Sequence, residues 1–192
     1  MSIAAEPIRI LALGDSLTAG YGLDIDDGFP NQLQEKLQLM GISARVFNGG
    51  VSGDTSAGGL ARLDWALADR PSHAIIELGA NDGLRGLDTA AMRSNLDAII
   101  QRLSDAGIAI LLTGMRAPPN LGRLYETAFN RVFPELAKKH NVAFYPFFLS
   151  GVAARPDLNL PDGLHPNRKG IAIIVDRIAP YVVRLIKNRK QE

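Results

Sequence analysis

Short apolar runs alternate with longer amphipathic stretches along this chain, and this alternation limits its fold more than any other feature. Five runs are short, aliphatic and apolar at consecutive positions, which is typical of strands covered by helices on both faces of a parallel sheet. These expected strands are residues 8–13, 44–48, 74–78, 109–113 and 142–145. The pattern predicts an α/β protein with a parallel sheet.

The stretches between and after these runs carry apolar residues at helical spacing. The expected helices are residues 29–40, 57–68, 89–106, 124–140 and 166–187. Pro30 and Pro166 suit first helical turns, whereas Pro180 is expected to kink or interrupt the last helix. Right-handed crossovers then give a three-layer α/β/α sandwich with a central five-stranded parallel sheet, as in flavodoxin. We expect residues 1–192 to form one domain.

Composition excludes several classes of function. The formal net charge is +1, so nucleic acid and acidic membrane surfaces are not expected as main partners. No apolar stretch approaches the roughly 18 residues of a membrane span, so stable membrane insertion is not expected. The chain has no cysteine, which excludes disulfides, thiolate metal sites and a cysteine nucleophile. The first ten residues lack the basic start and long apolar middle of a signal peptide.

Glycine and small polar residues follow the expected strands. The carboxyl ends of parallel strands lie at one edge of the sheet, so these segments should open on the same edge and form the site there. The segments are GDSLTAG (14–20), GGVSGDTSAGG (49–59), GANDGLRG (79–86) and GMRAPPNLG (114–122), with PDGLHP (161–166) closing the loop after the last strand.

Ser16 and His165 form a candidate nucleophile and base. A serine hydroxyl needs a base within hydrogen-bond reach, and the base needs a partner that orients it. Asp162 precedes His165 by three residues, so its carboxylate could accept the Nδ1–H of the imidazole and leave Nε2 for the serine. Alternatively, Asp162 is a turn carboxylate that caps the last helix, and Ser16 or its neighbour only caps a helix. His73 and His140 are expected to be solvated or to cap carbonyl groups.

Three groups could bind the oxyanion that forms when a serine attacks a carbonyl. Gly53 can present its N–H with no side chain in the way, Asn81 can present an amide N–H, and Ser16 has its own N–H at a helix start. The alternatives for the first two are a turn glycine and a capping asparagine.

Taken together, the blocks LALGDSLTAG, NGGVSGDTSAGGLARL, ELGANDGLRG and DGLHPN make the chain resemble the SGNH (GDSL) hydrolase family. They occur in the order of that family and span nearly the whole chain. The resemblance implies that Ser16 is the nucleophile, His165 the general base and Asp162 its orienting partner. It also implies an oxyanion hole made of Ser16, Gly53 and Asn81.

Within the family, the chain is most similar to bacterial acyl-CoA thioesterases that are also lysophospholipases and arylesterases. The resemblance implies a serine esterase or thioesterase that acts on small-molecule esters through an acyl-enzyme, without a metal or organic cofactor. It implies a periplasmic protein if a leader has been removed, and otherwise a cytoplasmic one. The alternatives are a carbohydrate O-acetylesterase of the same fold and a non-catalytic mononucleotide-binding module of the flavodoxin type. Candidate residues for the substrate pocket are Leu17, Leu84, Leu121 and Phe147.

Overall fold

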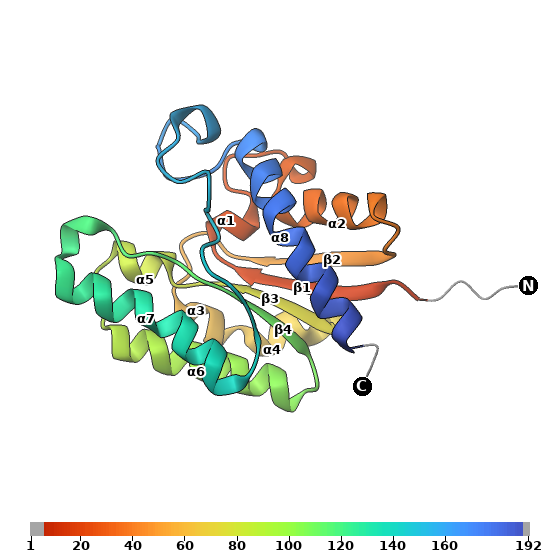
Figure 1. The fold of residues 1–192 in the computed structure, drawn as a ribbon, viewed down its shortest axis with the longest axis horizontal. Helices are drawn as coiled ribbons and strands as arrows, with labels where there is room; N and C mark the ends of the chain where they lie inside the picture. Colours follow the sequence, from red (N-terminus) through yellow and green to blue (C-terminus); the bar gives the residue numbers. More distant parts are fainter. Residues whose placement is uncertain (1–5, 190–192) are drawn as a thin grey trace, which may run out of the picture.

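A parallel sheet of five strands forms the centre of the protein. The computed structural model describes residues 6–189. The spatial order of the strands is β2-β1-β3-β4-β5, and every neighbouring pair is parallel. The order reverses direction at β1, which pairs with both β2 and β3 (Figure 1). The strands are β1 (Ile8–Gly14), β2 (Ala44–Gly50), β3 (His73–Glu77), β4 (Ala109–Thr113) and β5 (Ala143–Tyr145).

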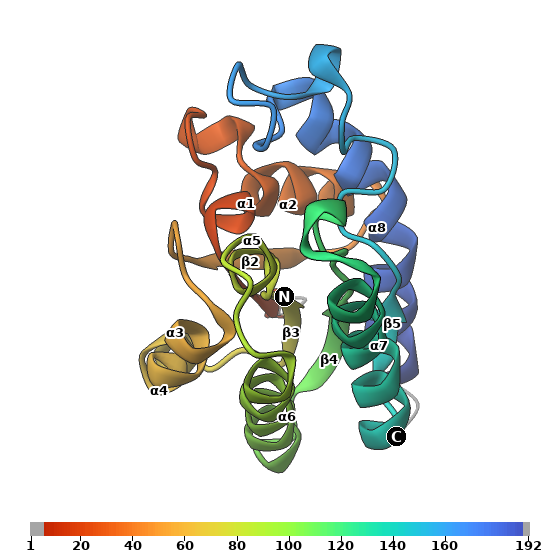
Figure 2. The ribbon, with the colours of Figure 1, turned by 90° about the vertical axis from the view of Figure 1, so that its left-hand side faces the viewer.

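Helices cover both faces of the sheet. One face carries α2 (Phe29–Leu39) and α8 (Arg168–Arg189), which pack against each other. The other face carries α3 (Ser56–Ala61), α6 (Thr89–Asp105) and α7 (Arg123–His140), as Figure 2 shows. The shorter helices are α1 (Ser16–Ala19), α4 (Leu63–Ala66) and α5 (Ala80–Leu84), and the 3₁₀ turns are η1 (Ile25–Asp27), η2 (Leu67–Asp69), η3 (Pro119–Leu121) and η4 (Pro156–Leu158).

The sheet is buried on both faces and the fold is an α/β/α sandwich, so both predictions from the sequence are confirmed. All five residues of β3 are buried, and so are the last four of β4, which is why the middle of each strand reads as a continuous apolar run. The main helices turn an apolar stripe to the sheet, including Leu33 and Leu37 of α2 and Ile174 and Ile178 of α8. Within residues 6–189, no helix combines the length and apolarity that crossing a bilayer requires.

The prediction of one continuous helix over residues 57–68 is wrong. α3 ends at Ala61, α4 follows as a separate turn, and η2 completes the segment. Gly59 explains part of this, because a Cβ at that position would lie 2.4 Å from Leu78 Cδ1, so close packing against Leu78, which follows β3, requires a poor helix former. Arg62, at the break, directs its guanidinium away to the carboxylate of Asp54 and the carbonyl of Gly14.

The last helix also differs from the expectation. It begins at Arg168 rather than Pro166, because the Asn167 side chain accepts hydrogen bonds from the N–H groups of Lys169 and Gly170 and so caps the helix. Pro180 does not interrupt α8, which continues to Arg189. A proline removes only one backbone hydrogen bond, and the buried apolar stripe on both sides of Pro180 holds the helix together.

The carboxyl ends of the strands gather the glycine-rich segments at one end of the molecule. β1 runs directly into α1, and β3 is followed by α5, both at the end opposite the start of β1 and the end of α8 (Figure 1). The reversal of strand order lies between these two segments. In open α/β sheets this is where ligand sites form.

Candidate active site

Ser16 and His165 meet at this edge of the sheet. Ser16 is the first residue of α1, and His165 lies in the loop just before α8. The Oγ of Ser16 lies 2.9 Å from Nε2 of His165, which is hydrogen-bond distance. Both side chains are partly exposed, so a small molecule can reach the pair. The structure therefore brings together the hydroxyl and the imidazole that the sequence singled out.

Asp162 orients the imidazole from the other side. Its Oδ2 lies 2.7 Å from His165 Nδ1, and its Oδ1 accepts the backbone N–H groups of Leu164 and His165 at 2.8 and 3.0 Å. These two backbone hydrogen bonds, followed by the bond from the imidazole, lower the pKa of Asp162 to about 2. The carboxylate is therefore ionised at neutral pH and fixes the proton of the imidazole on Nδ1. This leaves Nε2 as an acceptor for the serine hydroxyl.

Tyr21 packs on the face of the same imidazole. The two ring centroids are 4.4 Å apart, and the ring planes are inclined by 34°. Tyr21 follows α1 and is half exposed. The ring limits the rotation of the His165 side chain, so His165 is held by a carboxylate at one edge and by an aromatic ring on one face.

The turn that carries Ser16 is fixed by a buried carboxylate. Asp15 is fully buried and caps α1, because its Oδ1 accepts the N–H of Leu17 at 3.0 Å. Its Oδ2 accepts an amide N–H of Asn81 at 3.1 Å. Burial raises the pKa of Asp15 to about 6, and the hydrogen bonds from Leu17 and Asn81 act in the opposite direction. Asp15 thus holds the turn rather than facing the hydroxyl.

The candidate oxyanion donors lie on segments that hydrogen bonds tie to one another and to the turn of Ser16, and the donors differ in availability. Among residues 6–189, no acceptor takes the backbone N–H of Ser16 or of Gly53. Gly53 has a φ of 84°, a left-handed conformation that suits glycine. The amide of Asn81 already donates to Asp15 and, at 2.9 Å, to the carbonyl of Asp54. An oxyanion must therefore share or replace one of these two acceptors of Asn81.

The segments that hold these donors are tied to one another. Arg85 donates from Nη2 to the carbonyl of Gly53 at 2.8 Å. Arg62 donates from Nη2 to the carbonyl of Gly14 at 2.8 Å and from Nε to Asp54 at 2.5 Å. The three segments after β1, β2 and β3 are thereby cross-linked around Ser16.

Residues 12–173 match the model of the GDSL-like lipase/acylhydrolase family. This chain belongs to that family. It is 40% identical over 177 residues to an arylesterase of Vibrio mimicus, covering 92% of this chain and 88% of the relative. It is 39% identical over 186 residues to the thioesterase 1/protease 1/lysophospholipase L1 of Escherichia coli strain K12, covering 96% and 88%.

Solved structures of the same family share the fold. The crystal structure of TesA superposes with a TM-score of 0.87 at 40% identity and covers 92% of this chain and 99% of TesA. The crystal structure of AlinE4, an SGNH-hydrolase family esterase, gives a TM-score of 0.80 at 48% identity and covers 93% and 96%. The expected membership in the GDSL family and the expected fold are both confirmed.

The four candidate pocket residues of this GDSL hydrolase differ in exposure. Leu17 is almost fully buried in the core, and Leu84 is half exposed on α5. Leu121 is partly buried and lies near Gly86, since a Cβ built on that glycine would be 3.6 Å from Leu121 Cδ2. Phe147 is partly buried under the guanidinium of Arg116. Leu84, on the same short helix as Asn81, is therefore the member of this set that exposes the most apolar surface.

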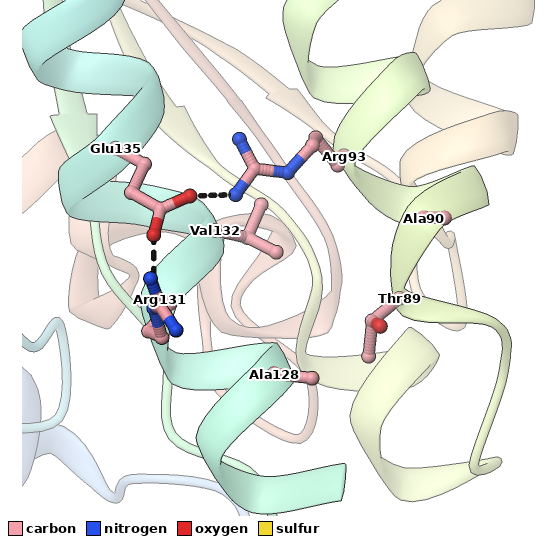
Figure 3. Close-up of a pocket in the computed structure, with 7 residues that line it drawn as sticks. All are labelled: Thr89, Ala90, Arg93, Ala128, Arg131, Val132 and Glu135. Carbon is pink, nitrogen blue, oxygen red and sulfur yellow. Dashed lines mark hydrogen bonds and ion pairs between the residues drawn. The ribbon is translucent and has the colours of Figure 1, made fainter.

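A hollow between α6 and α7 lies outside the GDSL site. Its volume is about 240 Å³, and Figure 3 shows Arg93 and Arg131 on either side of Glu135. Glu135 accepts from both arginines, from Arg131 Nε at 2.9 Å. The charges of this hollow are thus paired with one another, and none of the candidate catalytic residues lines it. The lining residues are Thr89, Ala90, Arg93, Ala128, Arg131, Val132 and Glu135.

The remaining histidines lie elsewhere. His73 starts β3, at the opposite edge of the sheet, and is buried beside Ser72 Oγ at 2.8 Å. Burial, followed by the charge of Arg189, lowers the pKa of His73 to about 4. The sequence predicted a solvated or carbonyl-capping role for both histidines, and this prediction is wrong for both, because His73 is buried. His140 is largely buried too, with its Nε2 2.6 Å from Asp97 Oδ1. Neither His73 nor His140 can serve Ser16.

Sequence reasoning missed two residues of the site. Glu77 is fully buried behind Asp15, and Tyr21 packs on His165. A signal for Glu77 was present, because a single carboxylate in the apolar run AIIEL has no reason to be buried without a partner. Tyr21 had no comparable signal, since an aromatic residue near a turn is common on protein surfaces.

Proposed function

We propose that this chain hydrolyses carboxylic esters and thioesters of small acyl or aryl substrates through a covalent acyl-enzyme on Ser16. The observation that carries the proposal is the 2.9 Å contact between Ser16 Oγ and His165 Nε2, with Asp162 Oδ2 2.7 Å from His165 Nδ1. A hydroxyl activated by an oriented base is the chemistry of acyl transfer.

In the first half of the reaction, Ser16 Oγ attacks the carbonyl carbon of the substrate, and His165 Nε2 takes the hydroxyl proton. The ionised Asp162 beside Nδ1 stabilises the imidazolium that forms. The negative charge on the former carbonyl oxygen is met by the N–H groups of Ser16 and Gly53 and by the amide of Asn81. His165 then gives its proton to the leaving alcohol or thiol, and the acyl group remains on Ser16.

In the second half, water replaces the leaving group. His165 Nε2 takes a proton from the water, whose oxygen attacks the acyl carbon over the same three donors. Collapse of this second tetrahedral intermediate returns the proton to Ser16 Oγ and releases the carboxylic acid. Every proton transfer in both halves passes through Nε2 of His165, because Nδ1 is bound to Asp162.

The names of the relatives support the substrate class. They include an arylesterase and a thioesterase that is also a lysophospholipase, both at about 40% identity over most of the chain. We propose aryl esters, acyl thioesters and lysophospholipids as substrates. The exposed apolar side chains of Tyr21, Leu84 and Leu164 beside the candidate site favour substrates with an apolar acyl or aryl group.

The two alternatives have weaker support. An acetylxylan esterase of Xylanibacter ruminicola is 26% identical, and this chain covers 43% of its length, so O-deacetylation of carbohydrates stands second. The strand order matches that of flavodoxin-like sheets. A mononucleotide-binding module, however, would leave the contact between Ser16 and His165 without a use.

A substrate panel tests the proposal. Purified protein is assayed with p-nitrophenyl acetate, p-nitrophenyl esters of longer acids, an acyl-CoA, a lysophosphatidylcholine and acetylated xylan. The proposal predicts turnover of the aryl ester and the thioester, and higher kcat/KM for longer acyl chains than for acetate. Turnover confined to acetylated xylan would transfer the assignment to a carbohydrate esterase. Failure to hydrolyse any of these substrates would contradict ester hydrolysis itself.

A further inference from the structure

Two carboxyl groups lie buried together beneath the turn that carries Ser16. Glu77 ends β3 and Asp15 follows β1, and both have no exposed surface. Gly14 pairs with Glu77 in the ladder between these strands, which sets the two acids beside each other. The two side chains adjoin, since the backbone N–H of Asp15 donates to Oε2 of Glu77 at 3.3 Å. Two ionised carboxylates buried side by side repel each other, which favours a proton on one of the two acids.

The hydrogen bonds around the pair decide which acid holds it. Asp15 accepts donors on both oxygens, from Leu17 N and from Asn81 Nδ2, as an ionised carboxylate does. Glu77 accepts on one oxygen only: Oε2 receives the hydroxyl of Thr18 at 2.8 Å and the N–H of Asp15 at 3.3 Å. Within residues 6–189, no donor reaches the buried Oε1 of Glu77. An oxygen without a donor is the one that can carry the proton.

We propose that Glu77 is a positioning residue that stays protonated at neutral pH and donates a hydrogen bond to the carboxylate of Asp15. Through Asp15 it fixes both the turn of Ser16 and the amide of Asn81. The inference rests on the proposed function for its effect on catalysis, whereas the proton itself does not depend on that function.

The electrostatics of the pair agree with this assignment. Burial, followed by the charge of Asp15, raises the pKa of Glu77 well above its ordinary value. The pKa of Asp15 rises only to about 6, since it accepts two donors and also faces His165. The other charged group beside this turn is Arg62, whose guanidinium binds the carbonyl of Gly14 rather than either acid. In the part of the chain that the structure describes, residues 6–189, no Lys, Arg or His side chain hydrogen-bonds to Glu77 to stabilise its ionised form.

Gly14 shows how closely the acid approaches the nucleophile turn. A Cβ at position 14 would lie 2.5 Å from Glu77 Oε2 and 2.1 Å from Thr18 Oγ1. The main chain that leads into Ser16 is thus in direct contact with Glu77 and Thr18. A displaced Glu77 carboxyl moves this main chain, and ionisation of Glu77 against the carboxylate of Asp15 supplies such a displacement.

Two substitutions separate a protonated acid from an ionised one. Glu77→Gln has the shape of the protonated acid: its oxygen accepts from Thr18 and Asp15, and its NH₂ donates to the carboxylate of Asp15. Glu77→Met fills the space without a hydrogen bond. Glu35→Gln, on the exposed face of α2, is the matched control for the chemical change alone.

The assay measures kcat and KM for p-nitrophenyl butyrate from neutral to alkaline pH. Glu77→Gln is expected to keep kcat within about twofold of the wild type at neutral pH, and to lose the decline that ionisation of Glu77 causes at alkaline pH. Glu77→Met is expected to lower kcat about tenfold or more with little change in KM, because buried donors and the Asp15 carboxylate lose their partner. A Glu77→Gln variant as impaired as Glu77→Met would overturn the proposal, and so would a fully active Glu77→Met variant.

Two readouts do not need catalysis. The infrared difference spectrum of wild type minus Glu77→Gln at neutral pH should contain the carbonyl band of a protonated carboxylic acid, and a carboxylate band alone would overturn the proposal. A raised acid pKa means that the folded protein binds more protons than the unfolded chain above about pH 4.5. The wild type should therefore lose stability relative to Glu77→Gln as pH rises above that value. A constant difference in Tm would contradict a protonated Glu77 even if the protein has no esterase activity.

Discussion

Asp162 binds His165 twice, once through the side chain and once through the main chain. Its Oδ2 lies 2.7 Å from the imidazole Nδ1, while its Oδ1 accepts the backbone N–H of the same residue at 3.0 Å. The carboxylate therefore fixes both the position of the histidine backbone and the direction of its ring. Replacement of this one residue tests whether the orientation of the ring matters for catalysis.

Asp162→Asn should lower kcat by about 10²- to 10⁴-fold with little change in KM. The amide oxygen can still accept the backbone N–H groups, but the NH₂ group then faces Nδ1 and forces the proton of the imidazole onto Nε2. In that tautomer His165 cannot accept the proton of Ser16. Steady-state kinetics on a p-nitrophenyl ester measures the effect, and a kcat close to that of the wild type would show that Asp162 has no orienting role.

The same variant gives a prediction for the pH dependence of stability. The pKa of Asp162 is lowered from 3.8 to about 2, so its stabilising contribution is complete above pH 3.8 and disappears as pH falls through 2. The difference in Tm between wild type and Asp162→Asn should not shrink from neutral pH down to about pH 5 and should shrink below pH 3.8. A difference that already shrinks between neutral pH and pH 5 would contradict the hydrogen-bonded carboxylate.

Asn81→Ala should lower kcat about 10²- to 10³-fold and change KM much less, because the amide acts on charge that develops during the reaction. It should also lower Tm, since Asn81 ties Asp15 to the carbonyl of Asp54. Asn95→Ala is the control: that amide donates to Ser56 and lies outside the candidate site. Loss of stability without loss of kcat in Asn81→Ala would assign the residue a structural role only.

Tyr21→Ala should lower kcat about threefold to tenfold, which corresponds to the roughly 0.5–1.5 kcal/mol of an aromatic contact. Its ring packs on His165, and without it the imidazole has more freedom to leave Ser16. Tyr21→Phe keeps the ring and should retain kcat. Equal losses in both variants would mean that the hydroxyl matters instead of the ring.

Gly14→Ala should lower both stability and kcat, because its Cβ would lie 2.1 Å from Thr18 Oγ1 in a buried turn. Overpacking of this kind costs about 1–3 kcal/mol. Gly107→Ala is the control, since its Cβ meets nothing within 4 Å and only the left-handed backbone, with a φ of 69°, opposes the substitution. Gly107→Ala should lower Tm without lowering kcat. A Gly14→Ala variant with normal Tm would contradict the close packing of this turn.

The sheet and the main catalytic candidates could be predicted from the sequence because they follow simple rules. Strands buried on two faces read as apolar runs, and parallel strands deliver the segments after them to one edge. Ser16 and His165 are far apart in the chain, but each stands at this edge. Their contact at 2.9 Å follows from that placement.

Most of the predictions that were wrong concern features that depend on contacts between distant segments. The division of residues 57–68 reflects the packing of Gly59 against Leu78, which no local periodicity reports. The buried position of His140 depends on its bond to Asp97. Glu77 was hidden for the same reason, since its partners come from β1 and α1. The start of α8 is an exception, because it depends on a local cap by the Asn167 side chain.

Covalent capture of the nucleophile tests the assignment of Ser16 most directly. The protein is treated with an organophosphonate that carries a fluoride leaving group, and the site of attachment is mapped by peptide mass spectrometry in wild type, Ser16→Ala and Glu35→Gln. One adduct, on Ser16, is expected in wild type and Glu35→Gln. None is expected in Ser16→Ala, whose kcat should be lower by about 10⁴-fold or more while its Tm stays close to that of the wild type. An adduct on another residue, or ester hydrolysis that persists in a folded Ser16→Ala variant, would contradict Ser16 as the nucleophile.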